Sequence, residues 1–289
     1  MRVLQLGTRC NNACVFCAAA GERELHAPAP SAELLLNALD SVPDGETLAL
    51  VGGEPTLHDD LPSLVRRAKR KVGRVVVQTN ARRLAYPSYA ESLAEAGVDA
   101  IDVSLHGSTE AMHDYHTSVA GSFRQTLRGA ANGASAGMSV VVTCVVTRSN
   151  FRHLAEVVAV AQAIGAKAVR FQAPRLSGRA LSARDRIVAH AELVVPYLKK
   201  AVVAGRTHGL DVIVGLPRGV TDFVPYVADQ VGTTASEDGP DAEASVLPCR
   251  AQPGPAHPAL AERRGRIRQT GPELRNILPR LFEPPSRGR

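Results

Sequence analysis

The sequence predicts an α/β fold in which β-strands and α-helices alternate around a parallel sheet. From Arg2 to about residue 215, short runs of β-branched residues alternate with stretches of helical periodicity. The strand-like runs are mostly apolar, as expected of parallel strands that are covered on both faces. The length of 289 residues is sufficient for one α/β barrel or for two ordinary domains.

Six strands are expected, and a seventh is a candidate. In chain order the six are Val3–Leu6, Thr47–Val51, Arg74–Thr79, Ala100–Leu105, Ser139–Thr147 and Ala168–Gln172, and the candidate is Asp211–Gly215. Helices between them have recognisable starts: Ser31 precedes residues 32–39, Asp60 precedes a Leu-Pro opening, and Asn150 precedes residues 151–164. We therefore expect residues 1–215 to form the core barrel.

Residues 216–289 differ in composition and are predicted to be a Pro/Arg-rich C-terminal extension. They contain eleven of the nineteen prolines, and residues 250–289 alone have nine Arg, no Lys and three Glu, which equals the whole net charge of +6. The extension is interpreted as a segment that covers the barrel mouth or as a partly disordered tail. Because the rest of the chain is neutral, a basic nucleic-acid-binding surface is not indicated.

The chain has no sequence feature of a membrane or secreted protein. No apolar run approaches the roughly 18 residues that a spanning helix requires, and the N-terminus lacks the sections of a signal peptide. Three of the five cysteines are crowded within eight positions, a poor disulfide framework but a reasonable set of metal ligands. A cytoplasmic protein is expected.

The strongest motif is a group of three cysteines directly after the first strand. Cys10, Cys14 and Cys17 are separated by three and then two residues. A loop of this kind can ligate three irons of a cubane cluster, and the fourth iron then remains open to a ligand, although such clusters usually have four cysteines. A zinc site and buried free thiols are the alternatives.

A second motif, Gly52-Gly53-Glu54-Pro55, ends the second strand. Its glycines let the backbone approach a ligand closely, and Glu54 can receive an ammonium group. The alternative is a tight turn without a functional role.

With Phe16 before the last cysteine, the two motifs resemble those of the radical S-adenosylmethionine (SAM) superfamily over about residues 3–178. The resemblance implies a partial (β/α)6 TIM-like barrel in which the amine and carboxylate of SAM chelate the open iron of a [4Fe-4S] cluster. An electron from the cluster then splits SAM to a 5′-deoxyadenosyl radical, which abstracts hydrogen from the substrate.

The resemblance also assigns expected site residues. Cys10, Cys14 and Cys17 are the expected cluster ligands, and the expected cofactor-binding residues are Gly52, Gly53, Glu54, Pro55, Thr79, Ser104 and Phe171. Thr79 and Ser104 would help to hold the methionine and ribose parts of SAM, and the backbone near Phe171–Ala173 would meet adenine. For the polar residues, routine roles at strand ends and in loops are the alternative.

Two further residues are candidates for catalysis. His106 follows the fourth strand and is the best histidine candidate for substrate contact or acid–base work. Cys249 lies in the C-terminal extension, and in some radical SAM enzymes a C-terminal cysteine returns hydrogen to a product radical or carries a methyl group. Cys144, within the fifth strand, is expected to be an ordinary buried thiol.

The predicted function is a radical SAM enzyme acting on a small metabolite or a peptide from a natural-product or cofactor pathway, with flavodoxin or ferredoxin as the reductant. The main alternative is a non-catalytic iron–sulfur electron-transfer protein. A glycyl-radical activating enzyme, an RNA-modifying enzyme and a zinc-binding module rank lower. An auxiliary cluster is not expected because Cys249 is the only cysteine after Cys144, and an N-terminal cobalamin domain is not expected because the chain starts at the first strand.

Overall fold

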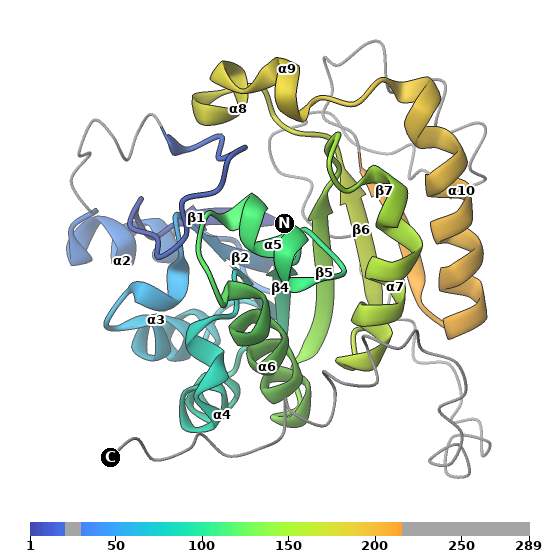
Figure 1. Cartoon of the computed structure of the whole chain (residues 1–289). Helices are drawn as coiled ribbons and strands as arrows, with labels where there is room; N and C mark the ends of the chain where they lie inside the picture. Colours follow the sequence, from blue (N-terminus) through green and yellow to red (C-terminus); the bar gives the residue numbers. More distant parts are fainter. Residues whose placement is uncertain (21–29, 216–289) are drawn as a thin grey trace, which may run out of the picture. The chain divides into compact units, whose positions relative to one another are not determined.

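The computed structural model describes residues 1–20 and 30–215, which form one parallel sheet with helices (Figure 1). Its seven strands lie in the order β1-β2-β3-β4-β5-β6-β7. They are β1 (Arg2–Gln5), β2 (Thr47–Val51), β3 (Arg74–Thr79), β4 (Ala100–Ser104), β5 (Ser139–Val145), β6 (Ala168–Gln172) and β7 (Asp211–Gly215). The α/β prediction is confirmed, and the candidate seventh strand pairs with β6.

Helices follow the strands along the chain. The α-helices are α2 (Ala32–Asp40), α3 (Leu61–Ala68), α4 (Pro87–Ala96), α5 (Glu110–Thr117), α6 (Ser122–Ser135), α7 (Leu154–Ala163), α8 (Gly178–Ser182), α9 (Arg184–Ile187) and α10 (Ala191–His208), and the 3-10 turns are η1 (Pro55–Leu57), η2 (Arg83–Ala85) and η3 (Phe151–His153). Ser31 caps α2 as expected, because its hydroxyl accepts a hydrogen bond from the Leu34 N–H at 3.2 Å.

Asn150 does not cap a helix, which corrects the predicted helix start. Its side chain is fully buried and accepts from the Thr147 N–H at 2.7 Å, while its amide donates to the carbonyls of His106 at 3.0 Å and Val145 at 2.8 Å. The chain instead forms the turn η3, and α7 begins only at Leu154. Asn150 therefore joins the segments that follow β4 and β5.

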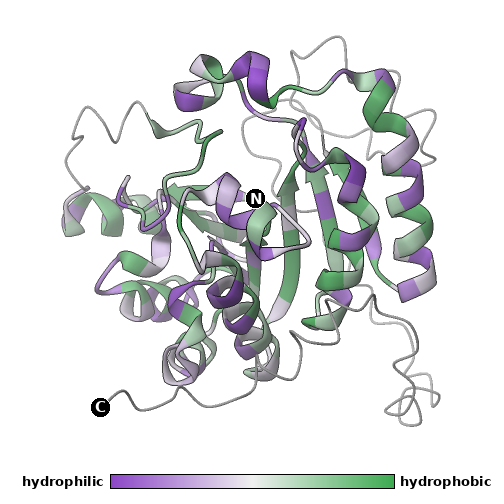
Figure 2. Cartoon of the chain, viewed as in Figure 1, coloured by the Kyte–Doolittle hydropathy of each residue, from purple (hydrophilic) through white to green (hydrophobic). Residues whose placement is uncertain are grey.

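The two faces of the sheet carry different residues. A Cβ added to Gly133 of α6 would lie 2.5 Å from the Ile101 side chain, and one added to Gly205 of α10 would lie 2.4 Å from the Val212 side chain. The row of Ile101 and Val212 therefore packs under the helices, which need small residues there. Figure 2 shows β5 mostly in the green of hydrophobic residues, whereas the helices alternate green and purple.

The opposite face of the sheet, which we call the inner face, contains a buried ion pair. Asp102, Thr143 and Arg170 lie on it, because side chains alternate between faces along a strand and paired residues share a face. The Arg170 guanidinium contacts the Asp102 carboxylate at 3.3 Å, and the Thr143 hydroxyl donates to that carboxylate at 2.6 Å. The inner face is thus polar where the outer face is apolar.

β1 is less covered than the sequence suggested. Val3 is 42% exposed, and Arg2 and Gln5 are also exposed. Within the described part of the chain, β1 pairs only with β2, so it is an edge strand. The expectation that every strand is covered on both faces is wrong for β1.

The predicted extension, residues 216–289, lies outside the described residues, and so does Cys249. Among residues 1–20 and 30–215, no helix has the length and apolar character that a membrane crossing would need.

Candidate cluster and cofactor site

The three cysteines lie on an irregular loop after β1, which we call the cysteine loop (residues 7–18), and each is partly exposed. Neighbouring elements satisfy the backbone of this loop. The Ala13 and Val15 N–H groups donate to the carbonyls of Thr117 and His116, each at 2.9 Å. Because these carbonyls belong to the last turn of α5, the end of that helix fixes the middle of the cysteine loop.

The three thiols lie close enough to influence one another. Burial, and then the neighbouring Cys10 and Cys17, raise the pKa of Cys14 to about 12. Cys10 Sγ accepts hydrogen bonds from the Asn12 N–H at 3.3 Å and from the Asn80 amide at 4.0 Å. A positively charged group bound beside Cys14 would favour its thiolate form. The donor set therefore fits an iron–sulfur cluster.

Within the described residues, no three side chains among His, Cys, Asp and Glu form a group that could hold a metal ion. A zinc site, in which four ligands lie at about 2.0–2.3 Å from one ion, stays the alternative for the three cysteines.

The two glycines of the second motif pack against the start of the cysteine loop. A Cβ on Gly53 would lie 2.2 Å from the carbonyl oxygen of Thr8, and a Cβ on Gly52 would lie 2.6 Å from that of Gly7. The backbones are also joined, because the Gly53 N–H donates to the Gly7 carbonyl at 2.9 Å. The glycines thus have a packing role that the sequence did not reveal, and their approach to a ligand stays a prediction.

Glu54 is buried, with 4% of its surface exposed, in a shell of neutral donors. Its Oε1 accepts from the Thr56 N–H at 3.1 Å, the Thr56 hydroxyl at 2.7 Å and the Thr79 hydroxyl at 2.6 Å, and its Oε2 accepts from the Asn80 N–H at 2.7 Å. Burial raises the pKa of this carboxyl, against the opposing effect of these hydrogen bonds. No Lys, Arg or His of the described residues forms an ion pair with it.

Sequence reasoning missed how Asn80 and Arg82 connect the two motifs. Asn80 donates from its backbone to Glu54 and from its side chain to Asn11 Oδ1 at 2.6 Å. Arg82 donates to the Asn11 carbonyl and, at 2.8 Å, to Asn12 Oδ1. The segment after β3 therefore ties the buried carboxylate to the cysteine loop. The only sequence signal for this link is the position of Asn80 directly after a predicted strand.

The other expected cofactor residues lie at the carboxyl ends of their strands. Pro55 is buried and begins η1, and Thr79 holds Glu54 as described above. Ser104 is the last residue of β4 and lies on the inner face. Phe171 is fully buried in β6 on the outer face, so only its backbone is placed to meet a ligand on the inner face.

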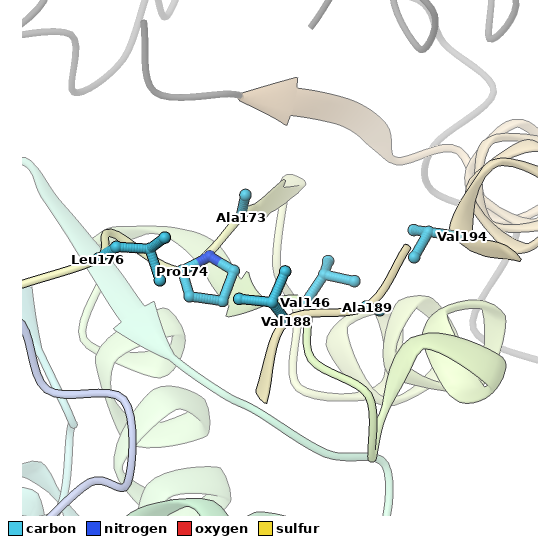
Figure 3. A pocket seen from close by; sticks show the side chains of 7 residues that line it. All are labelled: Val146, Ala173, Pro174, Leu176, Val188, Ala189 and Val194. Carbon is cyan, nitrogen blue, oxygen red and sulfur yellow. The ribbon is translucent and has the colours of Figure 1, made fainter. Parts of the chain in front are cut away.

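A small apolar pocket lies beside the segment that follows β6 (Figure 3). Its volume is about 40 Å³, enough for a few water molecules. It is lined by Val146, Ala173, Pro174, Leu176, Val188, Ala189 and Val194. The pocket is adjacent to the Phe171–Ala173 segment, for which contact with adenine is predicted.

His106 is 4% exposed and packs against the cysteine loop. The Phe16 ring packs against it edge-on with centroids 4.7 Å apart, and its Nδ1 accepts from the Val145 N–H at 3.3 Å. Burial, followed by the neighbouring His113 and His116, lowers the pKa of His106 well below its ordinary value. His106 is therefore neutral here, and its role in substrate contact or acid–base chemistry stays a prediction.

Comparisons with known proteins show what this chain is similar to. A family model described as the radical SAM superfamily matches residues 4–161. The chain is 29% identical over 185 residues to the AdoMet-dependent heme synthase of Nitratidesulfovibrio vulgaris, covering 63% of this chain and 50% of the relative. It is 32% identical over 155 residues to the Fe-coproporphyrin III synthase of Methanosarcina barkeri, covering 53% and 38%. It thus spans half or less of these relatives.

Among solved structures, the fold is similar to that of native anSMEcpe with bound AdoMet. The TM-score is 0.57 at 20% identity, covering 74% of this chain and 62% of that one. At this identity the likeness concerns the fold alone.

Proposed function

The chain belongs to the radical SAM superfamily of enzymes, and from this premise we propose that it binds a [4Fe-4S] cluster through Cys10, Cys14 and Cys17 and cleaves SAM reductively. The observation that carries the proposal is the link between the cysteine loop and the buried Glu54 carboxylate, made by Asn80. When bound, the cluster and SAM supply the electron and the 5′-deoxyadenosyl radical that abstracts hydrogen from the substrate.

Glu54 is proposed to receive the ammonium group of SAM. Its four hydrogen-bond partners are neutral donors, so they orient the carboxylate without neutralising its charge. A buried carboxylate without a cation is costly, and an ammonium group would supply the missing charge. Thr79 and Ser104 are proposed to hold the methionine and ribose parts, and the backbone of Phe171–Ala173 is proposed to meet adenine beside the apolar pocket.

The surroundings of the cysteine loop are proposed to exclude water. A buried apolar cluster lies beside the loop, and the partly buried Cys14 packs against it. The cluster consists of Phe16, Val145, Ala180, Ala183 and Ile187. A dry environment protects a reactive radical from side reactions. His106, neutral and packed on Phe16, is proposed to lie near the substrate, and Cys249 is proposed as a redox or radical residue although it lies outside the described residues.

We propose a small molecule as the substrate class, with a peptide as the second candidate. The heme synthase and the Fe-coproporphyrin III synthase favour a tetrapyrrole as the first compound to test. The proposed reductant is a flavodoxin or a ferredoxin.

The test is anaerobic reconstitution with iron and sulfide, followed by dithionite and SAM, with chromatography for 5′-deoxyadenosine and methionine. The reconstituted protein is expected to bind four irons and to form both products, and the Cys10/Cys14/Cys17 triple alanine variant is expected to form neither. A stable cluster without cleavage would refute SAM chemistry and favour an electron carrier.

Single-cysteine variants separate ligation from folding. Cys14→Ala should leave the fold intact and abolish 5′-deoxyadenosine formation, because one cluster ligand is lost. The matched control is Cys144→Ala, since Cys144 is fully buried in β5 on the outer face. Cys144→Ala should lower thermal stability by about 1 kcal/mol through a small cavity and retain cleavage. Unchanged cleavage in Cys14→Ala with a full cluster would count against the ligand assignment.

A further inference from the structure

The segment after β6 crosses over the cysteine loop, and Figure 1 shows α8 beside the dark blue N-terminal segment. We call residues 177–187, which include α8 and α9, the strap. The Arg179 N–H donates to the Cys17 carbonyl at 3.0 Å, and the Ser177 hydroxyl donates to the Ala18 carbonyl at 3.2 Å. The strap thus binds the end of the cysteine loop through main-chain carbonyls.

The strap is also packed against the loop. Its Ala180, Ala183 and Ile187 side chains lie in one buried cluster with Phe16, the residue just before Cys17. Gly178 has a φ of +52°, and a Cβ there would lie 2.6 Å from the Ala18 carbonyl oxygen. The close approach therefore requires glycine, and the strap has little freedom to move relative to the loop.

Arg179 places a positive charge beside a predicted cluster ligand. Its guanidinium is partly buried and donates to the Cys14 carbonyl at 3.3 Å. The guanidinium therefore places its positive charge on the main chain of a predicted cluster ligand. Arg184 on α9 is an exposed arginine of the same strap.

We propose that Arg179 is a positioning and tuning residue for the iron–sulfur cluster: its hydrogen bonds fix Cys14 and Cys17, and its charge makes the cluster easier to reduce. This inference rests on the proposed function. In the step concerned, the oxidised cluster takes up one electron from a one-electron donor protein, no bond forms or breaks, and no proton moves. The added negative charge is stabilised by a fixed positive charge nearby, because charge and hydrogen bonds near the sulfurs set such potentials.

The test is a redox titration of the reconstituted 289-residue chain without SAM, followed by electron paramagnetic resonance. Arg179→Gln removes the charge, Arg179→Lys keeps it, and Arg184→Gln removes an exposed charge of the same strap as the matched control. Arg179→Gln is expected to shift the reduction equilibrium about tenfold toward the oxidised cluster, which is about 59 mV lower for one electron. Arg179→Lys and Arg184→Gln are expected to remain close to wild type.

The outcomes separate this inference from the proposed function. A wild-type protein that binds no cluster would overturn both, whereas an intact cluster whose potential is the same in Arg179→Gln would overturn the inference alone. If Arg179→Gln does not retain its cluster, the role of the Arg179 charge is tested by Arg179→Lys instead. A cluster with a wild-type potential in Arg179→Lys supports the role of charge, and loss of the cluster in that variant as well overturns it.

Discussion

Glu54 illustrates how a single residue can be both strained electrostatically and held in place. Its carboxylate has four donors around it, all of them neutral, and burial still raises its pKa. Hydrogen bonds orient a buried charge, but they do not cancel the cost of removing it from water. A side chain in this state is prepared to bind a cation.

Glu54→Gln tests this reading with an isosteric change. Loss of the charge should weaken SAM binding by about ten- to a hundredfold, because a hydrogen bond to a charged group contributes about 1.5–3 kcal/mol. Equilibrium dialysis of SAM with the reconstituted protein measures the affinity. The matched control is Glu91→Gln, an exposed change on α4, which should not alter it. Equal affinities in the two variants would show that Glu54 does not hold the ammonium group.

At the residue scale, the sequence showed contiguous motifs but not the partners that come from far along the chain. Cys10, Cys14 and Cys17 and the Gly52–Pro55 motif could be read because spacing within a few residues carries the signal. Asn80 meets Asn11 across 69 positions, and Arg179 meets Cys14 across 165. Such contacts depend on which strand ends the sheet brings together, and no local pattern encodes them.

At the scale of elements, the cysteine loop has no regular secondary structure and relies on its neighbours for rigidity. Carbonyls in the last turn of α5 accept hydrogen bonds from N–H groups in the middle of the cysteine loop. The turn after β2 packs on the start of the loop, and an N–H group of the strap donates to a carbonyl at its end. An irregular loop satisfies its backbone in this way only when several elements supply partners. The geometry of the three thiols is therefore a property of the fold around them.

Gly178→Ala tests the contribution of the strap, and Gly209→Ala is its matched control. Both glycines have a left-handed φ, +52° and +68°, but a Cβ on Gly178 would meet the cysteine loop and one on Gly209 would meet nothing within 4 Å. Each variant should lose about 1–2 kcal/mol through backbone strain. Only Gly178→Ala should displace the strap and release the cluster faster.

The measurement is the decay of visible absorbance of the reconstituted variants under an iron chelator without oxygen. Gly178→Ala is expected to decay about tenfold faster than wild type, while Gly209→Ala decays at the wild-type rate. The same decay rate in both glycine variants would mean that the strap does not protect the cluster.

The strands could be predicted well because each contains an apolar run. Their end residues were predicted less well because contacts with distant residues determine where a strand ends. β2, β3, β6 and β7 have the expected limits, whereas β5 ends at Val145 instead of Thr147. The Thr147 N–H is bound by the Asn150 side chain, so the chain leaves the sheet there. The exposure of β1 was missed because the order of strands, which makes it an edge, is a property of the whole sheet.

At the scale of the whole molecule, the fold buries several ionisable groups near the cysteine loop. His106 and His116 pack against Phe16 of this loop, and His113 packs against His106. Burial is the largest cause that lowers the pKa of each of these histidines. The pKa of His113 falls to about 3. Its Nδ1 accepts from the His106 N–H at 3.1 Å, so the folded state holds the neutral ring. His113 Nδ1 cannot carry a proton while it accepts this hydrogen bond.

The contribution of these histidines to the stability of the apoprotein should therefore decrease as the pH falls below about 6.5. A histidine whose pKa is lower in the folded state contributes stability above its unfolded pKa of 6.5, and this is lost progressively as the pH falls toward the folded pKa of about 3. Each histidine that titrates in this way contributes about 1.4 kcal/mol per pH unit. The buried carboxyls of Glu54 and Asp102 act with the opposite sign, because burial raises their pKa.

A comparison of wild type with a histidine variant isolates the contribution of the histidine to the pH dependence of stability, because the carboxyl contributions are the same in both proteins and cancel in the difference. Urea unfolding of reduced apoprotein at pH 7, 6 and 5 gives the slope of the free energy of unfolding against pH. His113→Gln should reduce that slope by up to about 1.4 kcal/mol per pH unit, whereas His208→Gln, an exposed change at the end of α10, should leave it unchanged. The slope is the readout because loss of the hydrogen bond from the His106 N–H lowers the stability of His113→Gln at every pH. Identical slopes in wild type and His113→Gln would mean that His113 becomes protonated without unfolding, and that the packing beneath the cysteine loop tolerates its charge.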